Sequence, residues 1–244
     1  MKAVLYYFQR DFRKWTRSRV NIFASLVRPA AWLIFVGLTF PAKFTDNYLA
    51  FITPSILVMT VLFSSLQGGT LMVFDKMLGF LNKFLALPAR RESLLLGKIL
   101  FISTRGLIQA TVLLLVAGVL GVRIESLFHL VLVYLTLFLF AVFFSALSSM
   151  IGLALNDHDS YASVNSMVSM PLFFASSALM PYEVMPAWLR TLARFNPVSY
   201  AIDSIRLLFE VGTPTIPVQG ILGLAVAAFI MLLIGTYQFR RATV

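Results

Sequence analysis

The sequence of 244 residues contains no cysteine, only two histidines and few charged side chains. Without cysteine the chain has no disulfide, thiolate metal site or cysteine nucleophile, and two histidines argue against a histidine-based metal site. Charged residues make up 12% of the chain, whereas a soluble domain has about 25%. Hydrophobic residues make up 59%, which excludes a disordered chain. The composition therefore indicates an integral membrane protein.

Acidic residues are half as common as basic ones, with 10 Asp and Glu against 20 Lys and Arg and a net charge of +10. In a membrane protein we interpret this excess as a signal for topology and for attraction to anionic membrane lipids. It does not predict binding of nucleic acid.

Motifs that carry catalysis are missing from the sequence. Gly97-Lys98 has no glycine five residues earlier and is followed by Ile99, so it is not a phosphate-binding loop. Neither a His-Glu-x-x-His nor a Gly-x-Ser-x-Gly motif occurs. We therefore expect no enzyme, cofactor or metal in this chain. If ATP drives its work, ATP and Mg²⁺ bind a separate partner chain.

Long apolar runs dominate the chain instead. A membrane-crossing helix needs roughly 20 mainly apolar residues, and backbone in lipid must satisfy its own hydrogen bonds. Unbroken runs of this length also argue against a β-barrel. The sequence predicts an all-α integral membrane protein with one transmembrane domain, residues 1–244, and six spans at residues 20–40, 48–74, 99–120, 127–155, 161–180 and 221–237.

The distribution of Lys and Arg predicts the orientation. Six lie in residues 1–19, five between residues 76 and 98, and two at residues 240–241. Only five fall on the other side of the predicted spans. The pattern predicts a multi-pass protein of the cell inner (plasma) membrane with both termini in the cytoplasm.

Two cytoplasmic segments have amphipathic patterns. Residues 1–19 place apolar side chains at positions 5, 8, 12 and 15, which predicts a basic helix on the inner membrane surface. The alternative is a solvated basic leader. In the connection 75–98, Phe80, Phe84 and Leu87 share one helical face, and Pro88 ends the helix. That short helix fits either a partner protein or the lipid surface.

The outer connection, residues 181–220, combines prolines, aromatic residues and charges. Asn196 is placed to cap a helix that begins at Pro197, and Asp203 and Arg206 are three residues apart on one helical face. We expect two short helices that dip into the outer leaflet. The alternative is an interfacial anchor with Trp188 and Tyr200 in the aromatic belt.

Polar side chains within spans are costly and often functional. Arg28 lies inside the first predicted span, where it either snorkels to the interface or faces a water-filled path. Small and polar side chains elsewhere favour close helix packing over a substrate lining. The candidates for a pathway or an interface are Arg28, Thr60, Ser64, Gln67 and Asn165.

The motifs together resemble those of ABC type-2 export permeases, the membrane subunits that export drugs, polysaccharides and lipids. The cytoplasmic loop carries the residues Asp75-Lys76-x-x-Gly79-Phe80-Leu81, Leu87-Pro88-Ala89-Arg90 and Leu95-x-Gly97-Lys98. The outer segment carries Met180-Pro181, Met185-Pro186-x-Trp188-Leu189 and Asn196-Pro197-x-x-Tyr200-x-x-Asp203-x-x-Arg206. Where the family usually has an acidic residue, this chain has Met77.

This resemblance implies a permease that dimerises, as a homodimer or heterodimer, and binds two cytoplasmic ATPase subunits. It implies export of an amphiphilic drug, lipid or glycan; a channel or scaffold without an ATPase is the alternative. The implied ATPase-docking residues of the coupling helix are Asp75, Lys76, Gly79, Phe80, Leu81, Phe84, Leu87 and Pro88. The implied residues of the outer re-entrant motif are Pro186, Trp188, Asn196, Pro197, Tyr200, Asp203 and Arg206.

Overall fold

The computed structural model describes residues 2–39, 48–85, 90–122, 126–209 and 216–241. These residues form helices joined by turns and contain no strand, as the composition predicts. The helices are α1 (Lys2–Arg17), α2 (Arg19–Thr39), α3 (Tyr48–Met77), α4 (Phe80–Leu85), α5 (Glu92–Val119), α6 (Leu127–Ala154), α7 (His158–Phe174), α8 (Ala187–Phe195), α9 (Pro197–Phe209) and α10 (Val218–Arg241).

Five helices in the described part of the chain are long and apolar enough to cross a membrane, namely α2, α3, α5, α6 and α10. The predicted span at residues 161–180 corresponds to α7, which has 17 residues and ends at Phe174. The expected end at residue 180 is therefore wrong, because the chain turns directly after Phe174. The prediction of six spans is not confirmed by helix length and composition.

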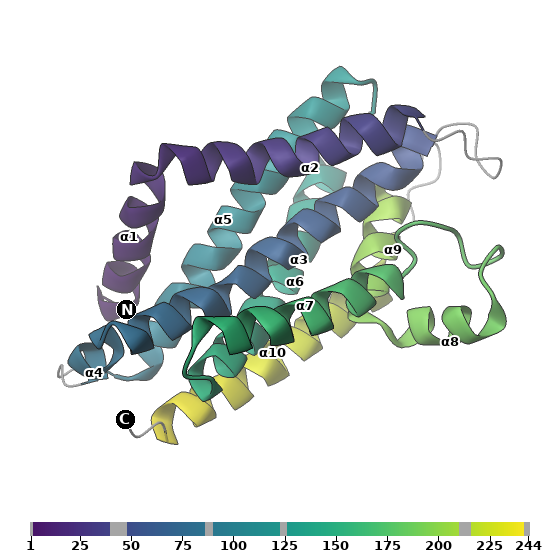
Figure 1. Ribbon diagram of the computed structural model, residues 1–244. Coiled ribbons are helices and arrows are strands. Elements are labelled where there is room, and N and C mark those ends of the chain that lie inside the picture. Colours follow the sequence, from purple (N-terminus) through teal and green to yellow (C-terminus); the bar gives the residue numbers. More distant parts are fainter. Residues whose placement is uncertain (1, 40–47, 86–89, 123–125, 210–215, 242–244) are drawn as a thin grey trace.

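Helix α3 forms the centre of the bundle. It packs against α2, α5, α6, α7 and α9 (Figure 1), and most of its apolar stretch is buried inside the protein. Leu57 and Leu62 of α3 join Phe140 and Phe144 of α6 and Ile202 of α9 in one apolar core. In lipid such a core is held mainly by close packing, because the surrounding solvent is itself apolar.

Small residues allow α3 and α6 to approach closely. A Cβ atom on Gly152 would lie 2.5 Å from the carbonyl oxygen of Gly69, so the two backbones meet at these glycines. Beside them, Ser148 donates to the carbonyls of Ser65 and Leu66 at 3.0 and 3.2 Å. The expectation that small and hydroxyl residues serve helix packing is confirmed at this contact.

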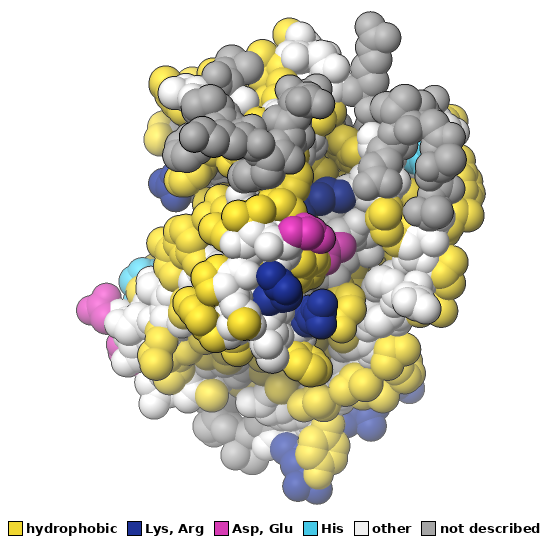
Figure 2. Space-filling view, turned by 90° about the vertical axis from the view of Figure 1, so that its right-hand side faces the viewer, with side chains coloured by type: hydrophobic (Ala, Val, Ile, Leu, Met, Phe, Trp, Pro, Cys, Tyr) yellow, Lys and Arg dark blue, Asp and Glu magenta, His cyan; other side chains and the backbone are white. Residues whose placement is uncertain are grey.

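The two ends of the bundle differ in structure. The amphipathic α1 meets the start of α2 at a steep angle and packs against α5, and both termini lie toward the end of the bundle that carries α4 (Figure 1). Helices α8 and α9 lie at the other end. The face that carries α8 is largely hydrophobic, with a few charged side chains gathered near its centre (Figure 2). We refer below to the α4 end and the α8 end.

Candidate functional site

A cavity of about 940 Å³ opens between α1, α2, α3, α5 and α7. It is lined by all five residues that the sequence suggests for a pathway or an interface. The structure therefore brings together side chains from α2, α3 and α7: Arg28, Thr60, Ser64, Gln67 and Asn165.

Three of the α3 side chains lie on one stripe because they are spaced four and three residues apart. The Thr60 hydroxyl donates to the carbonyl of Ile56 at 2.7 Å, as hydroxyl groups in lipid-embedded helices commonly do. Ser64 and Gln67 instead accept hydrogen bonds from a neighbouring helix. On α7, the side-chain oxygen of Asn165 is buried without a hydrogen-bond partner among the described residues.

The donor to this stripe is Arg105, a cavity residue that is not among the candidates selected from the sequence. Its Nε donates to the Ser64 hydroxyl at 3.2 Å, and its Nη2 donates to the Ser64 carbonyl at 3.1 Å and to Gln67 Oε1 at 2.7 Å. Arg105 is only 8% exposed. Its position halfway along an apolar span was the signal that should have singled it out.

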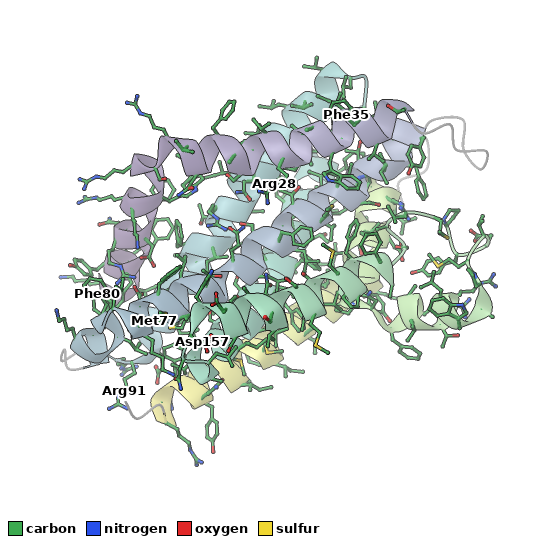
Figure 3. The ribbon with its side chains drawn as sticks, in the orientation of Figure 1. Arg28, Phe35, Met77, Phe80, Arg91 and Asp157 are labelled. Atoms are coloured by element: carbon green, nitrogen blue, oxygen red, sulfur yellow. The ribbon has the colours of Figure 1, made fainter. Side chains whose placement is uncertain are left out.

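Arg28 lies across the cavity on α2, below that helix in the view of Figure 3. It is exposed within the single chain and does not form an ion pair with any described residue. Aromatic and sulfur-containing side chains complete the lining, including Trp32, Met59 and Phe63. The cavity thus combines positive charge with apolar walls, as ligand sites often do.

A buried ion-pair cluster fastens α1, α3 and α5 together at the α4 end. Asp75 Oδ2 near the end of α3 lies 2.5 Å from Lys98 Nζ of α5 and 2.9 Å from Arg10 Nη2 of α1. Arg10 also pairs with Asp11 at 2.6 Å. Burial of Arg10 opposes its charge, but Asp11 and Asp75 outweigh burial and raise its pKa.

This cluster changes the interpretation of the predicted docking residue Asp75. The side chain is buried among helices of its own chain and does not lie on the surface. Its partners are Arg10 and Lys98, and the sequence pattern paired neither of them with Asp75. Their contacts join residues far apart in the sequence, so no local pattern announces them.

The remaining docking candidates divide into supporting and exposed residues. Lys76 Nζ donates to the carbonyls of Leu153 and Leu155 at 2.9 and 3.3 Å, which caps the end of α6. Gly79 adopts a φ of +69°, which lets the chain turn from α3 into α4. Leu87 and Pro88 lie outside the described residues.

Helix α4 is short but has two distinct sides. Leu81 is buried, and Phe84 packs edge-on against Tyr7 with ring centroids 5.3 Å apart. Phe80 is 42% exposed, next to Met77 and Leu78 at 54% and 60%. We call Met77, Leu78 and Phe80 the apolar tip. Met77 and Phe80 lie together at the α4 end in Figure 3.

Asn196 joins two helices at the α8 end. Its Oδ1 accepts from the backbone N–H of Val198 at 2.9 Å, so the predicted cap of the helix that begins at Pro197 is confirmed. Its Nδ2 donates to the carbonyls of Leu172 and Ala175 at 2.6 and 2.9 Å. One side chain therefore caps the start of α9 and satisfies carbonyls at the end of α7.

Asp203 and Arg206 form the predicted pair, with Arg206 Nη1 3.7 Å from Asp203 Oδ1. Arg206 also donates to the Ser55 hydroxyl of α3 at 3.0 Å. Asp203 accepts from the hydroxyls of Ser177 at 2.6 Å and Tyr182 at 2.7 Å. Burial and the Asp203 carboxylate raise the pKa of Tyr182 to about 12. The pair thus anchors the segment between α7 and α8 to the bundle.

The other residues of the outer motif lie around this anchor. Pro186 precedes α8, and Trp188 and Tyr200 are exposed on α8 and α9. The expected pair of short helices is confirmed, since α8 and α9 have 9 and 13 residues. Exposure of Trp188 and Tyr200 fits both a re-entrant segment and an aromatic anchor at the membrane surface.

Known proteins with similar sequences are transport permeases. Residues 2–209 match the family described as ABC-2 type transporter. The chain is 32% identical over 209 residues to the putative transport permease ycf38 of Cyanophora paradoxa, which covers 83% of this chain and 72% of that protein. It is 25% identical over 214 residues to the daunorubicin resistance ABC transporter permease protein DrrB1 of Streptomyces coeruleorubidus, over 86% of this chain and 76% of that protein.

A more distant relative is nodulation protein J of Rhizobium leguminosarum bv. trifolii, which is 22% identical over 244 residues, 96% of this chain and 91% of that protein. The family match covers the N-terminal helix and the two segments, around α4 and around α8–α9, from which the resemblance was argued. The chain belongs to the ABC-2 type transporter family.

Proposed function

We propose that this chain is the permease subunit of an ATP-driven exporter that works as a dimer with a separate cytoplasmic ATPase. Its cargo is an amphiphilic drug, lipid or glycan, which it moves out of the cytoplasm. Membership of the ABC-2 family supports this proposal, because its permeases normally pair with an ABC ATPase subunit. A homodimer and a heterodimer with a related permease both satisfy it.

The observation that carries the proposal is the apolar tip at the α4 end. Its three side chains are exposed although α4 is otherwise held tightly by Leu81 and Phe84. Rigidly presented apolar side chains next to a basic helix are typical of an interaction site. We assign ATPase contact to the apolar tip and to Leu87 and Pro88.

The buried docking candidates have a supporting role in this proposal. Asp75 joins α3 to α1 and α5, so a displacement of α4 would be transmitted to α1, α3 and α5 together. Lys76 ties the same turn to the end of α6, and Gly79 sets the direction of α4. Movement of the ATPase subunits would therefore be transmitted as a shift of packed helices.

Two further parts of the proposal concern the membrane. We propose that α7 is the sixth membrane-crossing helix, since 17 residues extend about 26 Å, close to the roughly 30 Å of a hydrocarbon core. Helix α7 runs between the α4 end and the α8 end (Figure 1). The α4 end is then cytoplasmic with both termini, in the inner (plasma) membrane, and α8–α9 form the outer re-entrant cap.

The test is assembly with the ATPase after substitution of one exposed aromatic residue. Phe80→Asp places a charge in the apolar tip, and Phe195→Asp places the same charge on an exposed aromatic position at the α8 end. Each variant is purified in mild detergent from its native membranes, and soluble subunits that follow it are quantified by mass spectrometry. We expect Phe80→Asp to lose the ATPase and Phe195→Asp to retain it.

Retention of the ATPase by both variants would remove the docking role from α4. Recovery of intact wild-type chain without any nucleotide-binding subunit would instead favour a channel or scaffold. In that case the apolar tip rests on lipid.

A further inference from the structure

The cavity contains more positive charge than the protein neutralises. Its charged lining residues are Asp11, Lys14, Arg28 and Arg105. Asp11, the one acidic residue among the described lining residues, is already paired with Arg10 and lies 3.9 Å from Lys98. No carboxylate of the described residues lies within ion-pair distance of Lys14, Arg28 or Arg105.

Of these charges, Arg105 is the one whose burial costs the most free energy. It is the fourteenth of 28 residues in α5, so it sits halfway through an apolar helix. Its recorded acceptors, the Ser64 hydroxyl, the Ser64 carbonyl and Gln67 Oε1, are all neutral. Those three bonds use Nε and Nη2, whereas Nη1 makes no hydrogen bond to the described residues. A buried guanidinium without a counter-charge is costly, and a bound anion would offset that cost.

Arg28 adds a second positive charge to the cavity. It is the tenth of 21 residues in α2 and faces the same cavity. Two guanidinium groups on different walls suit an oxygen-bearing anion, because each presents forked donors that match carboxylate and phosphate. Asn165 of α7 also lines the cavity and adds a neutral polar residue on a third wall.

Besides uncharged polar residues such as Asn21 and Gln109, the lining contains large apolar side chains that suit a hydrocarbon or ring system. Trp32, Met170 and Phe174 lie partly exposed along the cavity, and Met59 and Phe63 continue its wall. A volume of about 940 Å³ accommodates a drug-sized molecule. We propose that this cavity binds the anionic headgroup, phosphate or carboxylate, of an amphiphilic cargo between Arg28 and Arg105, with its apolar part against the aromatic wall.

This inference names the chemical class of the cargo and so rests on the proposed export function. Its test is a binding measurement that needs neither ATP nor the ATPase. The cargo assignment and the proposed export function can therefore fail independently of each other. If the chain assembles with an ATPase but binds charged and zwitterionic headgroups equally well, only the cargo assignment is refuted. A chain that selects anionic headgroups but never binds an ATPase refutes only the exporter.

Tryptophan fluorescence provides the readout because Trp15 and Trp32 both line the cavity. The third tryptophan, Trp188 on α8, is removed in a Trp188→Phe background. The full chain, with any subunit that remains bound, is titrated in neutral maltoside micelles with lysophosphatidic acid. Lysophosphatidylcholine with the same acyl chain serves as the zwitterionic probe, and inorganic phosphate serves as the headgroup alone.

We expect a saturable signal with lysophosphatidic acid and a much weaker one with the other two probes. Arg28→Gln should weaken binding of lysophosphatidic acid about tenfold or more, the effect of losing a charged hydrogen bond. Arg194→Gln removes an exposed charge on α8 and is the matched control without effect. Because Arg105→Gln risks misfolding, Arg105→Lys keeps the charge, loses the guanidinium fork and should bind with intermediate affinity.

Three results would overturn the assignment. Equal affinity for lysophosphatidylcholine and lysophosphatidic acid would show that the charge of the headgroup does not determine binding. Saturation of the same signal by inorganic phosphate at similar concentration would identify a site for a free anion. Unchanged affinity in both Arg28→Gln and Arg105→Lys would remove the two arginines from the site.

Discussion

Arg10 Nη2 in α1 lies 2.9 Å from Asp75 Oδ2, two residues before the end of α3. The same carboxylate oxygen lies 2.5 Å from Lys98 Nζ in α5. This contact between residues 10 and 75 fastens the amphipathic N-terminal helix to the base of the proposed coupling helix. Gly97 allows it, since a Cβ at this position would lie 2.7 Å from Tyr7 Cβ. Helix α1 is therefore an integral part of the α4 end.

The first prediction concerns the Asp75 cluster. Asp75→Asn removes the carboxylate nearest to Lys98, which is 0% exposed, and leaves only Asp11, 3.9 Å away, to balance its charge. Removing one member of a buried ion pair costs about 3–5 kcal/mol. We therefore expect a lower midpoint of thermal unfolding in detergent.

The double variant Asp75→Asn/Lys98→Met separates the roles of Asp75. Stability should return in large part because no unpaired lysine remains buried. If Asp75 only positions α4, assembly with the ATPase returns as well. Recovered stability without assembly would show that Asp75 contacts the ATPase directly. An Asp75→Asn variant as stable as wild type would contradict the cluster.

The second prediction concerns Asn196. Asn196→Ala removes both the cap of α9 and the donors to α7, whereas Asn196→Asp keeps the cap and loses the donors. Loss of a helix cap alone costs about 0.5–2 kcal/mol. Both variants should therefore unfold at a lower temperature than wild type, because alanine lacks the cap and aspartate sets a carboxylate oxygen against two carbonyl oxygens. Hydrogen exchange should accelerate at the end of α7 in both variants, and protection there in Asn196→Asp would contradict the shared role.

The third prediction concerns pH and Tyr182. Its pKa is raised from 10.0 to about 12 by burial and by the Asp203 carboxylate. A raised pKa in the folded state means that the contribution of Tyr182 is complete below pH 10 and is lost as the pH rises through about 12. The ultraviolet absorbance of tyrosinate, compared between wild type and Tyr182→Phe, measures it. A difference that titrates near the ordinary value would disprove the contact.

The fourth prediction concerns the glycine contact between α3 and α6. Gly152→Ala adds a Cβ 2.5 Å from the Gly69 carbonyl oxygen, and that backbone has no flexible end to move aside. Overpacking of this kind costs about 1–3 kcal/mol. The matched control is Gly223→Ala in α10, where a Cβ meets nothing within 4 Å. Equal unfolding midpoints for the two variants would show that the helices do not meet closely.

Local patterns in the sequence predicted the features that depend on near neighbours. The cap at Asn196, the pair of Asp203 and Arg206, and the α3 stripe of Thr60, Ser64 and Gln67 each follow from helical spacing. The five long helices follow from the length of apolar chain that lipid requires. The general preference of small and polar residues in spans for helix packing holds for Ser148. The stripe also contacts a neighbouring helix, α5, and in addition it lines the cavity.

Features that depend on residues distant in the sequence could not be predicted from local patterns. At the end of helix α7, the Asn196 side chain donates hydrogen bonds to the carbonyls of Leu172 and Ala175. Nothing within residues 161–180 indicates that partner. The burial of Asp75 could not be predicted locally, because its partners Arg10 and Lys98 lie 65 and 23 positions away in the sequence. Arg105 was not selected from the sequence, because its acceptors on α3 belong to another helix.

The central claim is that the chain works as the permease of an ATP-driven exporter. Native mass spectrometry of the complex, extracted in mild detergent from its own membranes, tests that claim most directly. The account predicts a dimer of permease chains bound to soluble subunits that hydrolyse ATP. An intact, folded chain that is recovered alone or only with itself, without a nucleotide-binding subunit, would contradict it.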